Sequence, residues 1–178
     1  QAWSNANLMN VNSKKTKEMV VYRQGGNWRK VVLPPVFPGI ERVDQIKVLG
    51  VTLTSALRFD SHISNVLKQT TQSSYALKIL KAHGLSGAPL WDITRATVVA
   101  RLLYASPVWW GYADAADKIR LQASIRRLVK RNFLPPDFLT FNNLCEGIDK
   151  KFFTYIHKNK THVLHHLLPP KKEICYDL

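Results

Sequence analysis

The sequence predicts an α+β fold in which a small antiparallel sheet is followed by a bundle of three to five helices. Within the first 54 residues, short runs rich in β-branched side chains are interrupted by proline and glycine, as is typical of short strands. From about Asp60 onward, apolar residues recur at helical spacing. The 178 residues, of which 46% are hydrophobic, suffice for one ordinary domain or two small ones. We therefore expect three parts: the sheet in residues 1–58, the main bundle in 59–134, and a helical extension with a loose tail in 135–178.

Turn residues bound the strands expected in the first part. Residues 24–27, QGGN, contain two glycines, as a tight hairpin turn requires. Prolines at positions 34, 35 and 38 interrupt pairing and indicate an edge or a loop. Gly50 lies inside an apolar strand pattern, where a glycine marks a bulge or a close approach of another chain. The expected strands cover residues 18–23, 28–33, 40–43 and 46–53.

Capping and breaking residues bound the expected helices. Asp60 or Ser61 can cap the first helix, and Gly84 ends it. Pro107 limits the second helix, and Asp149 is the expected cap of the last one. The expected helices cover about residues 61–83, 90–104, 114–133 and 149–160, whereas residues 138–146 are ambiguous and could form a short helix.

The chain is strongly basic, with a net charge of +14 from 26 lysines and arginines against 12 acidic residues. A globular chain with this charge most often binds nucleic acid, and less often an anionic membrane. A solubilising surface or an acidic partner would also account for the charge. Phosphate contacts made by clustered cations give affinity without sequence preference and make binding salt-dependent. The candidate nucleic-acid-binding cations on the third expected helix are Arg120, Arg126, Arg127, Lys130 and Arg131.

Cysteine usage and hydropathy indicate an intracellular protein of the nucleus or the cytoplasm. Cys145 and Cys175 do not make a disulfide framework, so a reducing compartment is expected. The sequence shows no secretory signal and no run of about 20 apolar residues, so we expect no membrane span. The chain begins at Gln1 instead of Met, which fits either a piece of a longer protein or processing.

Several segments resemble the reverse transcriptases of non-LTR, LINE-type retrotransposons. Residues 3–21, WSNANLMNVNSKKTKEMVV, are similar to the family's WxxxNxLxLNxxKTxxM block. Residues 44–63 contain KxLGVxL followed by LxFxxHI, and residues 101–127 contain YASPVWWG followed by LQ and an arginine pair. Residues 152–170, with HVLHHLLPP, match the usual end of these proteins. No single motif is as specific as a Walker loop, and residues 44–63 alone would also fit a plain sheet edge leading into a helix. The order and spacing of all the segments indicate the family.

The resemblance implies that the chain is the end of the palm and the thumb of an RNA-directed DNA polymerase. In that family the strand around Leu49 and Gly50 belongs to the primer-grip hairpin, and the thumb helices hold the RNA template and the DNA primer. A lysine before the last palm strand is assigned the delivery of a proton to the departing pyrophosphate, which is general-acid catalysis. Lys15 matches this lysine, with Lys14 as the neighbouring alternative because the segment is one residue longer than the pattern. A solvated lysine in a turn is the structural alternative.

The segment Tyr112 to Asp117, YADAAD, is similar to a polymerase Tyr-Ala-Asp-Asp motif, but its two carboxylates are three residues apart. They lie at an expected helix start, where aspartate is favoured by capping and by the helix dipole. Two-metal phosphoryl transfer needs carboxylates around two ions about 3.5–4 Å apart. The resemblance therefore implies that the catalytic aspartates precede Gln1 and that the chain alone is inactive. We expect no cofactor in this chain, with Mg²⁺ only in the missing part of the palm, and no small-molecule ligand.

Aromatic and histidine clusters have ordinary structural explanations. Trp109, Trp110 and Tyr112 lie between basic runs and could stack on bases, although core packing is the more common role. The histidines and the second cysteine near the C-terminus fit no standard zinc-binding spacing, so we expect no metal site. This group comprises His157, His162, His165, His166 and Cys175.

Three functions are compatible with these observations. The first is a reverse-transcriptase fragment that binds template and primer and lacks the catalytic aspartates. The second is a non-catalytic basic module, derived from a transposon, that binds nucleic acid or acts as a scaffold. The third, a membrane-surface protein, lacks the strongly one-sided apolar helix that it requires.

Overall fold

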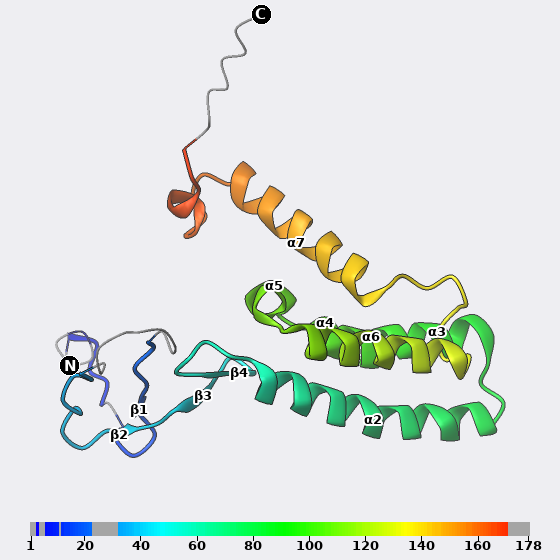
Figure 1. Cartoon of the computed structure of the whole chain (residues 1–178), viewed down its shortest axis with the longest axis horizontal. Helices are drawn as coiled ribbons and strands as arrows, with labels where there is room; N and C mark the ends of the chain where they lie inside the picture. Colours follow the sequence, from blue (N-terminus) through cyan, green and yellow to red (C-terminus); the bar gives the residue numbers. More distant parts are fainter. Residues whose placement is uncertain (1–2, 4–5, 11, 23–31, 171–178) are drawn as a thin grey trace, which may run out of the picture.

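The structure of the chain, a computed structural model, describes residues 3, 6–10, 12–22 and 32–170. Figure 1 shows the strands gathered at one end of the molecule, with a long helix leading away from them and shorter helices returning alongside it. A further helix leaves this bundle at an angle. The small sheet followed by a helical bundle confirms the predicted α+β class.

The strands form two separate pairs. β3 (Gln45–Val48) and β4 (Val51–Thr54) are antiparallel, with Ile46 opposite Leu53. β1 (Lys17–Glu18) and β2 (Glu41–Arg42) are parallel, a pairing that the expected antiparallel sheet did not include. The parallel pair is held by ionic contacts, because the guanidinium of Arg42 bonds to the carboxylate of Glu18.

The predicted strands are longer than the observed ones. Of the strand expected over residues 18–23, only Glu18 lies in a strand, as the second residue of β1. Of the strand expected over residues 40–43, two residues form β2. Residues 24–27 and most of 28–33, where a turn and a return strand were predicted, lie outside the described residues. Residues 32 and 33 are not in a strand.

The single strand predicted over residues 46–53 is a hairpin. Its two turn residues are Leu49 and Gly50, with φ angles of 47° and 89°. Two consecutive positive φ values are the signature of a tight hairpin turn of the primed type. The prediction of Gly50 inside a strand was therefore wrong. Leucine is a rare residue in such a turn, so the apolar pattern continued across it without a visible break.

The long helix α2 (Asp60–Ala82) matches the prediction over residues 61–83. Gly84 follows it with a φ of 93°, the left-handed conformation that glycine adopts after a helix end. The buried face of α2 combines apolar side chains with three polar ones: His62, Ile63, Val66, Thr70, Ser74 and Leu77.

The second predicted helix is one continuous helical rod made of three segments. α3 (Gly87–Thr94) and α4 (Ala100–Leu103) flank a π-helical segment, Arg95–Val99. A π-helical turn inserts one extra residue into a helix. As a consequence the adjacent Val98 and Val99 are both buried. The short α5 (Ser106–Trp109) follows after Ala105, which has a φ of 52°.

Two longer helices complete the chain. α6 (Ala115–Lys130) is capped by Asp114, whose carboxylate accepts the amide proton of Asp117 at 2.7 Å, as the helix-start interpretation predicted. α7 (Phe141–Lys158) is a single helix that joins the ambiguous segment to the last predicted helix. Its cap is Thr140, so the prediction that Asp149 caps a separate helix was wrong. A short 3₁₀ turn, His165–Leu167, follows.

The core lies among the helices and reaches the hairpin only at its edge. Trp109 and Phe141 are almost completely buried, and Trp110 contacts Phe141 with ring centroids 5.3 Å apart. The two tryptophans are thus core residues, as predicted, whereas Tyr112 is exposed. Val51 is the first buried residue in the sequence among those that the structure describes.

Candidate nucleic-acid interface

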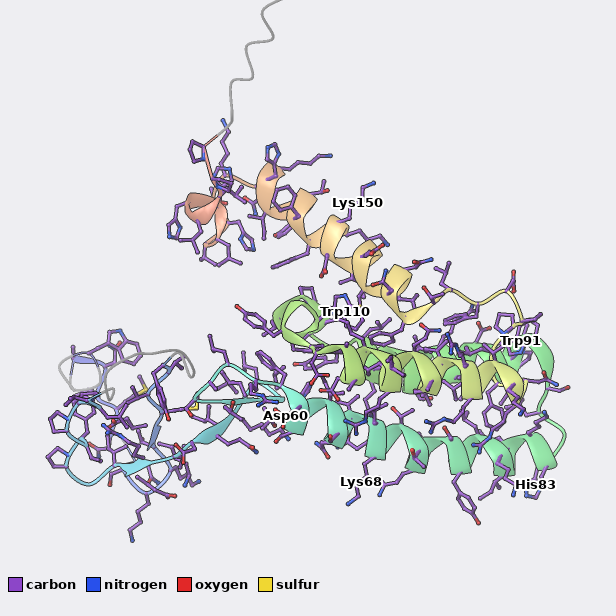
Figure 2. The ribbon with its side chains drawn as sticks, in the orientation of Figure 1. Asp60, Lys68, His83, Trp91, Trp110 and Lys150 are labelled. Atoms are coloured by element: carbon purple, nitrogen blue, oxygen red, sulfur yellow. The ribbon has the colours of Figure 1, made fainter. Side chains whose placement is uncertain are left out.

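A groove with a volume of about 380 Å³ runs between α2 and α6. Its α6 wall contains residues 120, 124, 127 and 131, which are spaced by four, three and four positions and therefore share one face of the helix. Residues of α2 form the opposite wall, and Figure 2 shows Lys68 between Asp60 at the start of that helix and His83 just beyond its end. The lining residues are Ser64, Leu67, Lys68, Thr70, Thr71, Ser74, Arg120, Ser124, Arg127, Leu128 and Arg131.

A second hollow of about 590 Å³ adjoins this groove and shares Thr71, Ser74 and Arg131 with it. It adds three lysines and an exposed tyrosine to the lining. Lys81 bridges its walls, because its ammonium group donates to the carbonyl oxygen of Arg131 at 2.8 Å and lies 5.8 Å from the Phe133 ring centroid. We refer to the two hollows together as the α2–α6 groove. Its cations are Lys68, Lys78, Lys81, Arg120, Arg127, Lys130 and Arg131.

The charge of the α2–α6 groove is mostly uncompensated. Arg120 bonds to the carboxylate of Asp117 at 2.7 Å and to the hydroxyl of Ser64 at 3.2 Å. Asp117 is itself buried, so this ion pair fixes the position of the Arg120 side chain in the groove wall. Within the described part of the chain, Arg127 and Arg131 have no ion pair with a carboxylate. The groove thus presents a row of available positive charges.

The structure brings together four of the five cations predicted on this helix. Arg120, Arg127, Lys130 and Arg131 line the α2–α6 groove. Arg126 instead lines a separate hollow of about 250 Å³ beside Trp110 and Phe141. Its position one residue before Arg127 turns it onto another face of α6.

Sequence reasoning missed the contribution of α2. Lys68, Lys78 and Lys81 complete the groove, together with the exposed Tyr75. Residues 68, 71, 75 and 78 follow one another at intervals of three, four and three, so they lie along one helical face. A helical projection of residues 61–83 would have revealed this basic stripe.

The other predicted site residues lie elsewhere. Leu49 is 87% exposed at the tip of the β3–β4 hairpin, and its carbonyl oxygen accepts a hydrogen bond from the Tyr104 hydroxyl at 2.9 Å. An added Cβ on Gly50 would lie 3.3 Å from Tyr104 Cε1. Lys15 is exposed in a turn in which its amide donates to the Asn12 carbonyl at 3.0 Å. The N-terminal segment that contains Lys15 lies beyond the hairpin, away from the groove (Figure 1).

Two titratable groups outside the groove, Glu18 and Cys145, have a shifted pKa that their contacts or their burial explain. Glu18 accepts a hydrogen bond from the Phe37 amide at 3.0 Å, and this bond and Arg42 lower the pKa of its carboxyl group. Burial raises the pKa of the Cys145 thiol to about 12. Within the part of the chain that the structure describes, no group of three or more His, Cys, Asp or Glu residues is placed to hold a metal ion.

None of the helices in the described ranges combines the length and the hydrophobicity needed to cross a lipid bilayer. Comparisons of the chain with protein-family models, with curated proteins and with solved structures found no match.

Proposed function

We propose that this chain is the palm end and thumb of a non-LTR reverse transcriptase, and that the α2–α6 groove binds the sugar-phosphate backbone at one edge of the duplex of RNA template and DNA primer. The observation that carries the proposal is the row of seven cations along this groove, only one of which is paired with a carboxylate in the described chain. A protein that neutralises successive phosphates needs such a row, without acidic residues between its members.

The spacing along α6 suits a phosphate backbone. An α-helix rises about 1.5 Å per residue, so Arg127 and Arg131 are separated by about 6 Å along its axis, and Arg120 and Arg127 by about 10 Å. Arginine can donate two parallel hydrogen bonds to one phosphate, which adds geometric definition to the charge attraction. Neither feature depends on base identity, so binding is expected to be indifferent to sequence.

In the proposed polymerase, the β3–β4 hairpin serves as the primer grip. The exposed Leu49 at its tip is available to contact the primer backbone, and the glycine beside it permits the tight turn. Lys15 acts as the general acid for the pyrophosphate leaving group, and its exposed position leaves it free to meet a nucleotide bound by preceding palm residues. The catalytic aspartates and their Mg²⁺ ions belong to that preceding part of the palm.

Binding is tested by titrating a fluorescent RNA–DNA hybrid duplex at increasing salt. The double variant Arg127→Gln/Arg131→Gln is expected to weaken binding by about tenfold or more and to lower the slope of log K against log salt by about 2. The matched control is Lys118→Gln/Arg126→Gln, which removes the same charge from another face of α6 and is expected to change both quantities much less. Equal effects of the two double variants, or an affinity that does not respond to salt, would contradict the proposed interface.

The polymerase assignment needs a separate test. The chain alone, supplied with Mg²⁺, is expected to bind a primed template without extending it, whereas a protein that adds the preceding palm segment extends the primer. Extension by the chain alone that Asp114→Asn abolishes would refute the structural role given to this aspartate. Duplex binding by the longer protein with no extension at all would instead favour the non-catalytic, transposon-derived module.

A further inference from the structure

Two residues that line the α2–α6 groove have a buried hydroxyl oxygen with no hydrogen-bond partner in the described part of the chain. Thr70 Oγ1 belongs to α2 and Ser124 Oγ to α6, so the two groups come from opposite walls. The two residues are only 4% and 5% exposed, respectively. A buried hydroxyl without a partner is unfavourable, and in a native protein it requires an explanation.

Neighbouring hydroxyl groups on α2 do have a hydrogen-bond partner, which is a carbonyl oxygen of the preceding helical turn. Thr71 Oγ1 donates to the carbonyl oxygen of Leu67 at 3.0 Å, and Ser74 Oγ donates to that of Thr70 at 2.9 Å. Such bonds to the preceding turn are the usual solution for threonine and serine in a helix. Thr70 and Ser124 do not adopt it, and both line a groove whose available charges are positive.

We propose that Thr70 and Ser124 form a seat for one phosphodiester group of a nucleic-acid strand. On binding, each side chain turns about its Cα–Cβ bond, which brings the buried hydroxyl into the groove to donate a hydrogen bond to a non-bridging oxygen, while Arg127 and Arg131 neutralise the charge of the phosphodiester. This seat rests on the proposed function, since it assigns a specific contact within the same groove. A volume of about 380 Å³ is equivalent to roughly a dozen water molecules. It accommodates the backbone of one strand at its edge, and not a whole duplex.

The chemistry of the seat excludes a cation and favours an anion. Hydroxyl groups can donate or accept, but the surrounding guanidinium groups are donors only and repel positive charge. The carboxylate of Asp117 lies in the first turn of α6 and is paired with Arg120. It therefore does not neutralise the guanidinium groups near Ser124. A phosphodiester oxygen is an acceptor with negative charge, which matches both sets of groups.

Substitution of the two hydroxyls separates a ligand seat from a structural role. Thr70→Val and Ser124→Ala remove the donors with little change of volume, and because the hydroxyls are unpaired in the free protein, its melting temperature is expected to stay the same or to rise. The double variant is expected to bind the fluorescent RNA–DNA hybrid about 10- to 100-fold more weakly. Ser74→Ala is the matched control: its hydroxyl lines the same groove but already has a partner, so binding should change less than about twofold.

Nucleic acid with an uncharged backbone tests whether the bound group is a phosphodiester. Hybrids with methylphosphonate linkages lack the charge and one of the two non-bridging oxygens, so they are expected to bind more weakly and to respond less to Thr70→Val/Ser124→Ala. Inorganic phosphate is the second probe. If it competes with the hybrid at low millimolar concentration, and loses this ability in the double variant, the seat belongs to a free anion and the strand assignment is overturned.

The outcomes also distinguish this inference from the proposed function. If Arg127→Gln/Arg131→Gln weakens binding while Thr70→Val/Ser124→Ala lowers the melting temperature and leaves binding intact, the hydroxyls are structural and only the inference fails. If neither double variant weakens binding, the α2–α6 groove is not the interface and the proposed function fails with it.

Discussion

Gly50 is required by its backbone conformation and by the ring beside it. Its φ of 89° strains any L-residue, and an added Cβ would lie 3.3 Å from Tyr104 Cε1. Gly50→Ala is therefore expected to lower the free energy of unfolding by about 1–2 kcal/mol in chemical denaturation. Gly84→Ala is the matched control, because Gly84 has a φ of 93° but open space around it. If Gly50→Ala costs no more than Gly84→Ala, the Tyr104 ring does not restrict this position.

His62 is a buried titratable group, and neither of its ring nitrogens has a hydrogen-bond partner among the residues that the structure describes. Its ring packs edge-on against Trp109 with centroids 5.7 Å apart. Burial, and secondarily the charge of Lys47, lower the pKa of this imidazole. The unfolded chain, with an ordinary pKa near 6.5, then takes up the proton more readily. Stability is expected to fall as the pH drops below about 6.5. The decline should be shallower in His62→Phe, as measured by denaturant unfolding at several pH values; identical slopes would contradict the assignment.

Cys145 is expected to be chemically inert in the folded protein. Burial is the main reason that its thiol pKa rises to about 12, so the reactive thiolate is scarce at neutral pH. In a Cys175→Ser background, labelling of Cys145 by iodoacetamide should follow the fraction of unfolded protein across a denaturant series. Rapid labelling of the native protein, detected by mass spectrometry, would show that this residue is accessible.

At the scale of single elements, Tyr104 joins the hairpin to the helices. Its hydroxyl donates to the Leu49 carbonyl oxygen at 2.9 Å, and its own carbonyl oxygen accepts the indole proton of Trp109 at 3.0 Å. Tyr104→Phe is expected to lower stability by at most about 1 kcal/mol, because the side chain is 55% exposed. Its clearer effect should be faster hydrogen exchange of the β3–β4 amides. Tyr75→Phe on α2 is the control, and equal exchange rates in both variants would contradict the link.

The helices were more predictable than the strands because their signals are longer. α2 and α6 extend over many residues with an apolar period and clear end signals, and both were predicted within one or two residues at their starts. The beginning of α7 was missed because Asp149 was read as a cap, although Thr140 already fulfils that role for a helix that passes through Gly147. Strands of two to four residues give almost no periodic signal, and their pairing depends on contacts such as Arg42 with Glu18.

The candidate site was only partly predictable for a related reason. The cations of α6 are visible in the sequence because five of them lie within twelve residues. Which of them face α2 depends on the helical rotation, so Arg126 was grouped with its neighbours although it lies on another face. The unpaired state of Thr70 and Ser124 is a property of three-dimensional packing, and no sequence pattern distinguishes them from the satisfied Ser74.

For the whole molecule, burial is distributed unevenly. All of the buried described residues lie from Val51 onward and most of them are in the helices, whereas the described residues before Val51 are exposed or half-buried. A chain that begins at Asp44 and retains the hairpin and the helices is therefore expected to melt cooperatively, with a melting temperature within a few degrees of that of the full chain. Circular dichroism at 222 nm measures this. Loss of the cooperative transition would show that the N-terminal segment is needed for the bundle to fold.

The π-helical segment Arg95–Val99 sets the angular phase between the two ends of the molecule. Leu90 and Leu102 are both completely buried although they are twelve positions apart; with one inserted residue discounted, eleven regular steps of about 100° complete three turns. Deletion of the exposed Thr97 would return the rod to a regular helix and keep Leu90 and Leu102, then eleven positions apart, on one face. Tyr104 would therefore keep its direction toward Leu49. A deletion of one codon would thus leave hairpin and bundle in register, whereas a regular helix of the present length would rotate everything after it by about 100° relative to α3.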